Sequence, residues 1–258
     1  MADIIRVISL NKSFQLSAKQ QKLEGTREKI VHAVNGLSFD AQEAEIFGLL
    51  GPNGAGKTTT LRMLATLIKP DSGDAILDGA SIVSEPELVR AKIGFLTSEL
   101  KLEEFFTPSY LYDFFASLYK IDPAIRDARK KDIFERFGIR GFAEVKIANL
   151  SSGMKQKASL AISLVHDPDI IIFDEPTNGL DVLTAKVVTD YLLELKAQGK
   201  TIIVSTHIFS LAERICDRIG IIIKGKMAAC GTLDEVRAGQ SLEDRFFDIY
   251  SETVGASL

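Results

Sequence analysis

A glycine-rich run is the stretch of this chain whose residue types and spacing most plainly suit chemistry. It follows the pattern glycine, four residues, glycine, lysine, threonine. The run is Gly51, Pro52, Asn53, Gly54, Ala55, Gly56, Lys57 and Thr58, and Thr59 follows it. Glycines let backbone N–H groups surround a polyphosphate, and the positive end of a following helix dipole adds to the attraction. The pattern therefore predicts a phosphate-binding loop, in which Lys57 would reach the β- and γ-phosphates and Thr58 would help to hold Mg²⁺.

The alternative is a glycine-rich turn between a strand and a helix, with no ligand. The flanking sequence favours the phosphate-binding loop, because residues 46–50 are apolar, as in a buried strand that ends at the loop. Residues 58–68 place Leu61, Leu64, Ala65 and Ile68 at helical spacing, which predicts a helix directly after the loop. Pro70 and the turn-forming residues around it should end that helix.

An acidic pair, Asp174 and Glu175, closes the apolar run 170–173. Such a pair is often only a solvated turn. In a chain that also carries a phosphate-binding loop, an aspartate at a strand end assists Mg²⁺. The glutamate after it is then placed to polarise the attacking water as a general base. We therefore predict Asp174 as a metal-associated residue and Glu175 as a catalytic residue.

Composition limits the other classes of function. The chain has 258 residues, 46% of them hydrophobic and 26% charged, as in an ordinary globular protein. Its formal net charge of -4 argues against bulk binding of nucleic acid. No run approaches the roughly 18 apolar residues that a membrane-spanning helix needs, so we expect any membrane role to come through a partner. Cys216 and Cys230 are expected to be buried free thiols.

Short β-rich runs alternate with helical patterns, which predicts an α/β fold with a largely parallel sheet. Residues 170–173 and 201–204 should be central strands, and 218–230 should form two strands joined at 224–226. Residues about 98–165 differ, because Thr107 and Pro108 begin a helix and a charged helix follows at 123–137. This stretch predicts an inserted helical subdomain. Residues 15–30 are polar and are interpreted as an exposed hairpin extension or loop.

Three further motifs occur in order along the chain: Leu-Ser-Ser-Gly-Met-Lys-Gln at 150–156, Pro-Thr-Asn-Gly-Leu-Asp at 176–181, and Ser-Thr-His at 205–207. With the glycine-rich loop and the acidic pair, this series resembles the ATP-binding subunit of an ABC transporter over nearly the whole chain. The resemblance implies a P-loop NTPase fold with a RecA-like core, an N-terminal antiparallel β subdomain and the inserted helical subdomain. It divides the chain into an ABC ATP-binding domain at 1–237 and a C-terminal helical tail at 238–258.

The resemblance also assigns roles to individual residues. It implies that two chains sandwich two ATP molecules, with Ser151 and Gly153 of one chain facing the γ-phosphate held by the other. Asp181 would communicate between the two sites, and His207 would act as the switch histidine that contacts the γ-phosphate. Phe14 resembles the aromatic residue that stacks on adenine. A core phenylalanine is the alternative for Phe14.

Two motifs depart from the usual pattern of the family. The signature has Leu-Ser-Ser-Gly-Met instead of Leu-Ser-Gly-Gly-Gln, although Ser151 and Gly153 are kept. Ser98 stands at the usual glutamine position; its hydroxyl is shorter, so direct contact with Mg²⁺ is not expected, and action of Ser98 or Glu99 through a water stays open. Both departures resemble the sodium-extrusion and drug-export subgroup, of the ABC-2 exporter type.

The resemblance implies an ATPase that powers solute export through separate integral-membrane subunits, with ATP and Mg²⁺ as cofactors and a homodimer as the working unit. The chain would be cytoplasmic and peripheral on the inner face of the cell membrane, with no nucleic-acid partner. Two alternatives are a soluble ABC-type ATPase acting on nucleic acid or ribosomes, and a non-catalytic module with decayed sites. In the tail, Leu242, Phe246 and Ile249 predict an amphipathic helix packed on its own domain, with a partner contact as the alternative.

Overall fold

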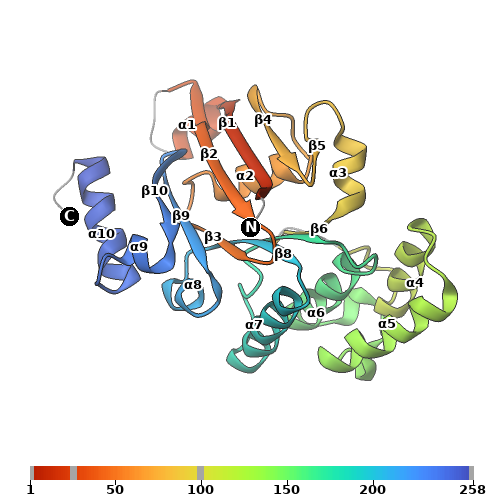
Figure 1. The fold of residues 1–258 in the computed structure, drawn as a ribbon. Helices are drawn as coiled ribbons and strands as arrows, with labels where there is room; N and C mark the ends of the chain where they lie inside the picture. The colour runs from red at the N-terminus through yellow and green to blue at the C-terminus, as the bar shows by residue number, and fades with distance from the viewer. Residues whose placement is uncertain (1–2, 24–27, 98–101, 256–258) are drawn as a thin grey trace.

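Two β-sheets, with helices on both sides of the larger one, form the structure, a computed structural model that describes residues 3–23, 28–97 and 102–255 (Figure 1). The smaller sheet is antiparallel, in the order β2-β1-β4-β5. Its strands are β1 (Asp3–Gln15), β2 (Ile30–Gln42), β4 (Ser72–Leu77) and β5 (Ala80–Ser81). The larger sheet has the order β10-β9-β3-β8-β7-β6. Its strands are β3 (Ile46–Leu50), β6 (Ile93–Leu96), β7 (Ile170–Asp174), β8 (Thr201–Thr206), β9 (Arg218–Ile223) and β10 (Lys226–Thr232).

The larger sheet is parallel from β6 to β9, and only its edge strand β10 is antiparallel to its neighbour. Its central strands β3, β7 and β8 are buried along their whole length, as expected of apolar strands covered on both faces. Because side chains alternate along a strand, Phe47 and Leu49 face the smaller sheet while Ile46 and Leu50 face the opposite core. The predicted central strands are therefore confirmed.

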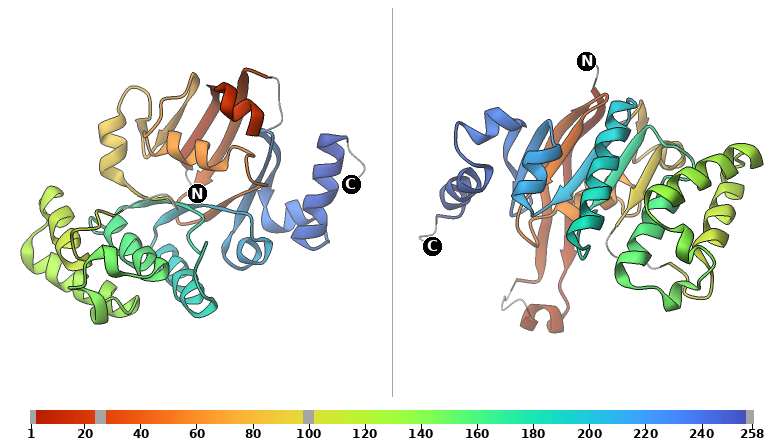
Figure 2. Two further views of the ribbon diagram at one scale, coloured as in Figure 1. Left: turned by 180° about the vertical axis from the view of Figure 1, so that it is seen from behind. Right: turned by 90° about the horizontal axis from the view of Figure 1, so that it is seen from below.

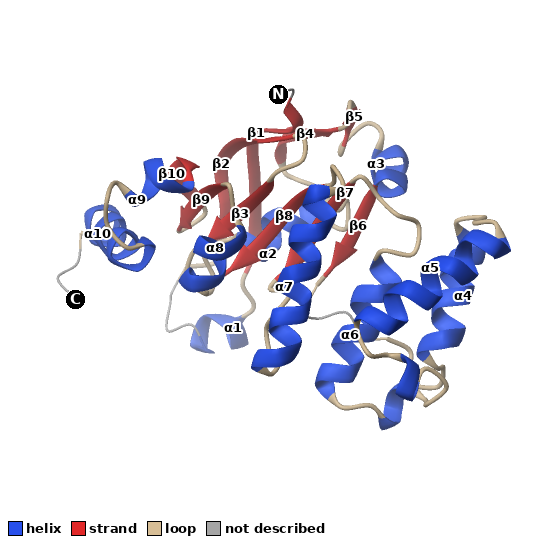
Figure 3. Ribbon diagram, turned by 60° about the horizontal axis from the view of Figure 1, so that its bottom comes forward, coloured by secondary structure: helices blue, strands red, loops and turns tan. Residues whose placement is uncertain are grey.

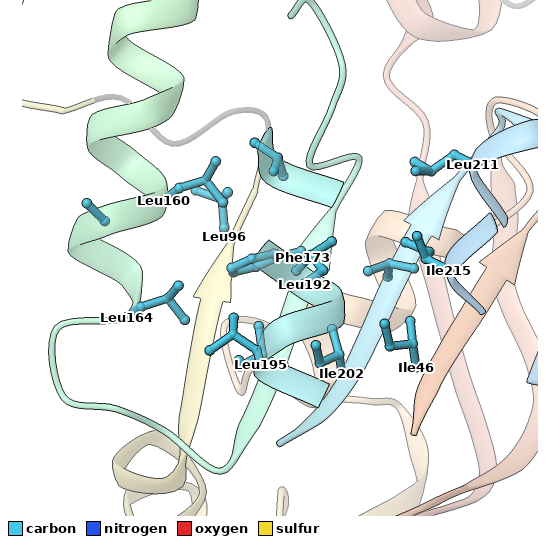
Figure 4. Close-up of a cluster of buried hydrophobic side chains, with 14 of the residues drawn as sticks. Ile46, Leu96, Leu160, Leu164, Phe173, Leu192, Leu195, Ile202, Leu211 and Ile215 are labelled. Carbon is cyan, nitrogen blue, oxygen red and sulfur yellow. The ribbon is translucent and has the colours of Figure 1, made fainter. Parts of the chain in front are cut away.

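Helices complete the two layers. The helix α2 (Lys57–Leu64) lies between the two sheets, and the helices α6, α7 and α8 cover the other face of the larger sheet (Figures 1 and 3). Figure 4 shows the core on that face, where Phe173 and Ile202 of the sheet meet Leu160, Leu192 and Leu195. The remaining helices are α1 (Ala18–Leu23), α3 (Pro86–Lys92), α4 (Pro108–Leu118), α5 (Pro123–Arg136), α6 (Ser152–Ser163), α7 (Val182–Ala197), α8 (Phe209–Ile215), α9 (Leu233–Arg237) and α10 (Leu242–Val254).

The helical group α4 to α6 is inserted between β6 and β7. The Thr107 side chain accepts a hydrogen bond from the backbone N–H of Tyr110 at 3.2 Å, so this threonine caps α4 as predicted. The group and the C-terminal helix α10 lie at opposite ends of the molecule (Figure 2). Short 3₁₀ turns at Arg140–Phe142 and Ile147–Asn149 connect α5 to α6. Among the described residues, no helix is both long and apolar enough to cross a membrane.

Two further predictions concern the hairpin extension at residues 15–30 and the helix in the C-terminal tail. The strands β1 and β2 pair as far as Gln15 and Ile30, so they form a hairpin up to the ends of the segment 15–30. The described residues of that segment contain the unpredicted short helix α1 (Figure 2). The tail forms α10, whose Leu242, Phe246 and Ile249 are buried in the core of the chain itself. Packing of this helix on its own domain is thereby confirmed.

Three sequence expectations need correction or have no structural outcome. The helix after the glycine-rich loop ends at Leu64 rather than near residue 68, because Thr66 adopts a left-handed φ of 58° that an α-helix does not allow. Cys216 is buried as expected, but Cys230 is exposed because alternate residues of the edge strand β10 face solvent. Ser98 and Glu99 lie outside the described residues.

Candidate functional site

The glycine-rich loop joins the end of the buried strand β3 to the start of α2, as the pattern predicts. Gly54 and Gly56 have left-handed φ angles of 78° and 108°. A Cβ atom added at Gly56 would lie 2.3 Å from the carbonyl oxygen of Ala33, which no side chain could tolerate. Glycine is therefore required here both by the backbone angle and by the close approach of β2. The result is a loop whose N–H groups lead into the N-terminus of a helix.

Lys57 lies folded back over this loop. Its Nζ atom donates hydrogen bonds to the carbonyl oxygens of Gly51 at 2.6 Å and Pro52 at 3.2 Å. Burial lowers the pKa of Lys57, and the nearby negative charges of Glu175 and Asp174 act in the opposite direction. A buried cation held over a loop of backbone donors is suited to contact an anionic phosphate.

The turn between β9 and β10 is hydrogen-bonded to the glycine-rich loop. The backbone N–H of Gly225 donates to the carbonyl oxygen of Ala55 at 2.9 Å, and the carbonyl of Gly225 accepts from Asn35 at 2.8 Å. Gly225 has a φ of 77° and lies close to the carbonyl of Ala33. Two segments distant in sequence, β2 and the turn between β9 and β10, therefore hold the loop in one conformation.

The acidic pair lies at the carboxyl end of β7, beside the loop. Asp174 is only 1% exposed, and its carboxylate accepts a short hydrogen bond from the hydroxyl of Ser205 on the neighbouring strand β8. The same hydroxyl accepts a hydrogen bond from the backbone N–H of Glu175 at 3.1 Å. Glu175 adopts a left-handed φ of 53°, a conformation that costs a non-glycine residue about 1–3 kcal/mol and that occurs often at functional sites.

His207 holds the side chain of Glu175. Its Nδ1 atom lies 2.9 Å from Oε1 of Glu175, and an ionised carboxylate can only accept, so Nδ1 carries the proton and donates. This contact joins the ends of β7 and β8 across the mouth of the site. The carboxylate of Glu175 is therefore aimed by a partner rather than free in solvent.

A cavity of about 260 Å³ brings several predicted residues together. It is lined by Phe14, by the loop residues from Asn53 to Thr59, and by Glu175. Phe14 is 41% exposed on β1, opposite Val31 of β2, so the alternative of a core phenylalanine is wrong. An open aromatic ring, a polyphosphate loop and a carboxylate thus share one cavity.

Seven other predicted residues, all within the described part of the chain, do not line this cavity. Gly51 and Pro52 contact the lining residue Lys57, His207 contacts the lining residue Glu175, and Asp174 directly precedes Glu175.

Ser151, Gly153 and Asp181 lie at the starts of two helices instead. Ser151 caps α6, where its hydroxyl accepts from the backbone N–H of Met154 at 3.3 Å. Gly153 lies in the first turn of the same helix. Asp181 caps α7 by accepting from the N–H groups of Leu183 and Thr184, both at 3.0 Å. These residues therefore do not complete the site of their own chain.

Comparison with known families identifies the chain. The model of the family described as "ABC transporter" matches residues 34–178. The chain belongs to the ABC transporter family. The ATP-binding protein NatA of Bacillus subtilis is 36% identical over 229 residues, which cover 88% of this chain and 93% of NatA. This ABC chain is therefore an ATP-binding subunit with ATPase activity, as the ordered motifs predict.

A second relative and a solved structure extend the comparison. The Nod factor export ATP-binding protein I of Burkholderia lata is 40% identical over 77% of this ABC chain and 65% of its own length. The solved structure is a dimeric ATP-binding cassette in a post-hydrolysis state with ADP and Pi, with a TM-score of 0.78 and 26% identity. It covers 89% of this chain and 98% of its own. The predicted P-loop NTPase fold is thereby confirmed for this ABC subunit.

Ser205 is a site residue whose role the sequence did not show. Its hydroxyl bridges Asp174 and the backbone of Glu175, although 31 and 30 residues separate them in sequence. The available signal was a small polar residue at the carboxyl end of a predicted strand, beside His207. In this ABC subunit it positions both acidic residues.

Proposed function

We propose that two copies of this chain bind two ATP molecules between them and hydrolyse them to power export through separate membrane subunits. The observation that carries the proposal is the single cavity that joins Phe14, the loop from Asn53 to Thr59, and Glu175. The similarity to a Nod factor export ATP-binding protein, 40% identical over 77% of this chain, supports the exporter assignment.

ATP binding uses the ring and the loop. Adenine stacks on Phe14, whose exposed ring borders the cavity, since stacking needs only an accessible π face. The triphosphate follows the loop from Gly51 to Thr59, where backbone N–H groups and the N-terminus of α2 attract it. Lys57 then exchanges its bonds to the Gly51 and Pro52 carbonyls for the β- and γ-phosphates.

The donor set at the loop suits Mg²⁺. The described residues contain no cluster of three or more His, Cys, Asp or Glu side chains for a metal ion. Mg²⁺ does not need such a cluster, because it typically takes one or two protein oxygens and completes its shell with phosphates and waters. The Thr58 hydroxyl and the buried Asp174 carboxylate would hold it. When bound, the ion neutralises charge on the phosphates.

Hydrolysis uses the aimed carboxylate. Glu175 polarises a water that attacks the γ-phosphorus, and the bond to the β–γ bridging oxygen breaks to give ADP and phosphate. His207 orients Glu175 through Nδ1 and presents its other ring nitrogen to the γ-phosphate side of the site. Ser151 and Gly153 at the start of α6 of the second copy donate to the same phosphate, and Asp181 lies between the two sites.

The membrane subunit docks on the helical group. An apolar hollow of about 360 Å³ there is lined by Leu102, Phe106, Tyr110, Leu111, Phe114, Phe115 and others. Tyr110 and Phe114 are 50% and 44% exposed. Exposed aromatic residues around a hollow mark a protein contact, and a membrane subunit is the partner that an ATP-binding subunit of a transporter requires. The chain is then cytoplasmic and peripheral on the inner face of the membrane.

Co-purification tests this proposal. The tagged chain, expressed with its neighbouring genes and extracted from membranes in detergent, should bring with it a polytopic membrane protein. The double variant Tyr110→Ser and Phe114→Ser should lose that protein yet still bind ATP. Ile125→Ser, at an equally exposed apolar residue of α5, is the matched control and should retain it. Recovery of ribosomes or nucleic acid in place of a membrane protein would contradict the proposal.

A further inference from the structure

Two aliphatic side chains at the start of α7 are unusually exposed to solvent. Val182 and Leu183 are 85% and 77% exposed, the highest fractions of any large hydrophobic residues in the described ranges. They are also fixed in place, because Asp181 accepts from the backbone N–H of Leu183 and from both the N–H and the hydroxyl of Thr184. A rigid, apolar projection in water is a typical feature of a contact surface.

An apolar hollow of matching size lies beside the nucleotide loop. It measures about 160 Å³, close to cavities that hold one benzene-sized group. Its lining includes Leu50, Pro52, His207, Phe209, Phe246 and Phe247. The last three form an aromatic group, with ring centroids of Phe209 lying 5.2 Å from Phe246 and 6.4 Å from Phe247. The C-terminal helix α10 thus supplies one wall of a hollow that reaches the phosphate-binding loop.

The projection and the hollow belong to the same edge of the molecule. Leu50 ends β3 and His207 follows β8, while Val182 begins the helix that follows β7. These three strands are parallel neighbours, so the segments after them emerge on one side of the sheet. A surface that carries both a projection and a receptor can pair with a copy of itself through a two-fold axis.

We propose that Val182 and Leu183 of one chain pack into the aromatic hollow of a second copy, and that this contact occurs twice in the dimer. The inference rests on the proposed ATP sandwich, because it needs two copies facing each other across the nucleotide edge. The occupant is a second copy because the chain itself presents an apolar group of the right size on that edge. The similar solved cassette is also dimeric.

The contact gives the C-terminal helix a role at the nucleotide site. His207 and Pro52 share the hollow with Phe246 and Phe247, so a side chain inserted from the second copy touches residues that hold Glu175 and Lys57. Removing this apolar surface should weaken the dimer about tenfold for each contact, and about a hundredfold for the symmetric pair, since a large aliphatic side chain is withdrawn from water in each.

Dimerisation is the first test. Glu175→Gln chains with ATP and Mg²⁺ are compared by analytical ultracentrifugation, with and without Leu183→Ser or Phe247→Ala. Leu183→Ser removes a largely exposed side chain, so its monomer should unfold at an unchanged temperature. Phe247→Ala also removes ring contacts with Phe209 and Phe246, so its dimerisation is measured well below its own unfolding temperature. The expected result is a dissociation constant raised about a hundredfold for Leu183→Ser. Leu118→Ser, at a 59% exposed leucine at the end of α4, is the matched control and should leave it unchanged.

Cross-linking is the second test. In a Cys230→Ser background, which removes the exposed thiol, chains with Leu183→Cys and differently sized chains with Phe247→Cys are mixed and oxidised. A disulfide between the two sizes should form in the presence of ATP. Leu118→Cys chains mixed with Phe247→Cys chains should give none.

The outcomes separate this inference from the ATP sandwich on which it rests. The inference is overturned, and the ATP sandwich left intact, if an ATP-dependent dimer forms, its dissociation constant is unchanged by Leu183→Ser and Phe247→Ala, and no disulfide forms between residues 183 and 247. The absence of any dimer from Glu175→Gln with ATP overturns both. The inference is also overturned if Leu183→Ser and Phe247→Ala leave the dimer unchanged and Phe247→Ala instead alters the binding of a membrane protein or another protein.

Discussion

Ser205 offers a sharp test of how the acidic pair is held. Its hydroxyl donates to the buried carboxylate of Asp174 and accepts from the N–H of Glu175. In Ser205→Ala the N–H keeps the backbone oxygen of residue 205 as acceptor at 3.2 Å, but Asp174 loses a donor while only 1% exposed. A hydrogen bond to a charged group contributes about 1.5–3 kcal/mol. We therefore expect the free energy of unfolding to fall by about 2 kcal/mol.

Calorimetry and steady-state kinetics measure the effect. For a chain of this size, 2 kcal/mol lowers the unfolding temperature by about 4–8 °C. The kcat for ATP should also fall by about tenfold, because the Glu175 carboxylate loses the hydroxyl that fixes its backbone. The dissociation constant of ATP should change little, since Ser205 does not line the cavity.

The same substitution at another buried serine provides the control. Ser159 is 3% exposed within α6, and Ser159→Ala should cost less than about 1 kcal/mol and leave kcat unchanged. Equal destabilisation by the two variants, with normal kcat in both, would refute the reasoning about Ser205.

Two further predictions follow from the same geometry. Phe14→Ala should raise the dissociation constant of ATP about tenfold in calorimetric titration, because base stacking contributes about 1–3 kcal/mol, while the unfolding temperature stays the same; unchanged affinity would show that adenine lies elsewhere. Hydrogen bonds from Thr184 and Leu183 lower the pKa of Asp181, so the carboxylate cap stabilises the fold above the ordinary carboxyl pKa and loses this effect as pH falls through the lowered value. Asp181→Ala should therefore unfold at a lower temperature than the parent at pH 7, and this difference should shrink in acid; a pH-independent difference would contradict the capping role.

The parts of the site that depend on local sequence could be predicted. The loop from Gly51 to Thr58 needs only glycines, a lysine and an apolar strand before it, and all of these are adjacent in the chain. Asp174 and Glu175 are marked in the same way by the apolar strand that they close. Thr107 could be identified as a cap because capping involves neighbours within one turn.

The rest depends on contacts between distant segments, which one sequence does not reveal. Ser205 meets Asp174 because β7 and β8 pair in a particular register. Gly225 supports Ala55 through a single backbone hydrogen bond across the molecule. The early end of α2 follows from the left-handed backbone of Thr66, a residue type that rarely adopts that conformation. Asp181 was predicted to belong to the ATP site and to communicate between the two sites, and its capping of α7 adds a local role.

The central claim is that this chain hydrolyses ATP with Glu175 as the base. The most direct measurement is ATP turnover by Glu175→Gln, together with ATP affinity and the mass of the complex. The amide keeps the size of the side chain but cannot accept the proton, and a general base contributes roughly 10²–10⁴-fold to the rate. We predict that turnover falls by that factor while ATP still binds and holds a dimer. Hydrolysis at the unmutated rate would contradict the assignment of Glu175.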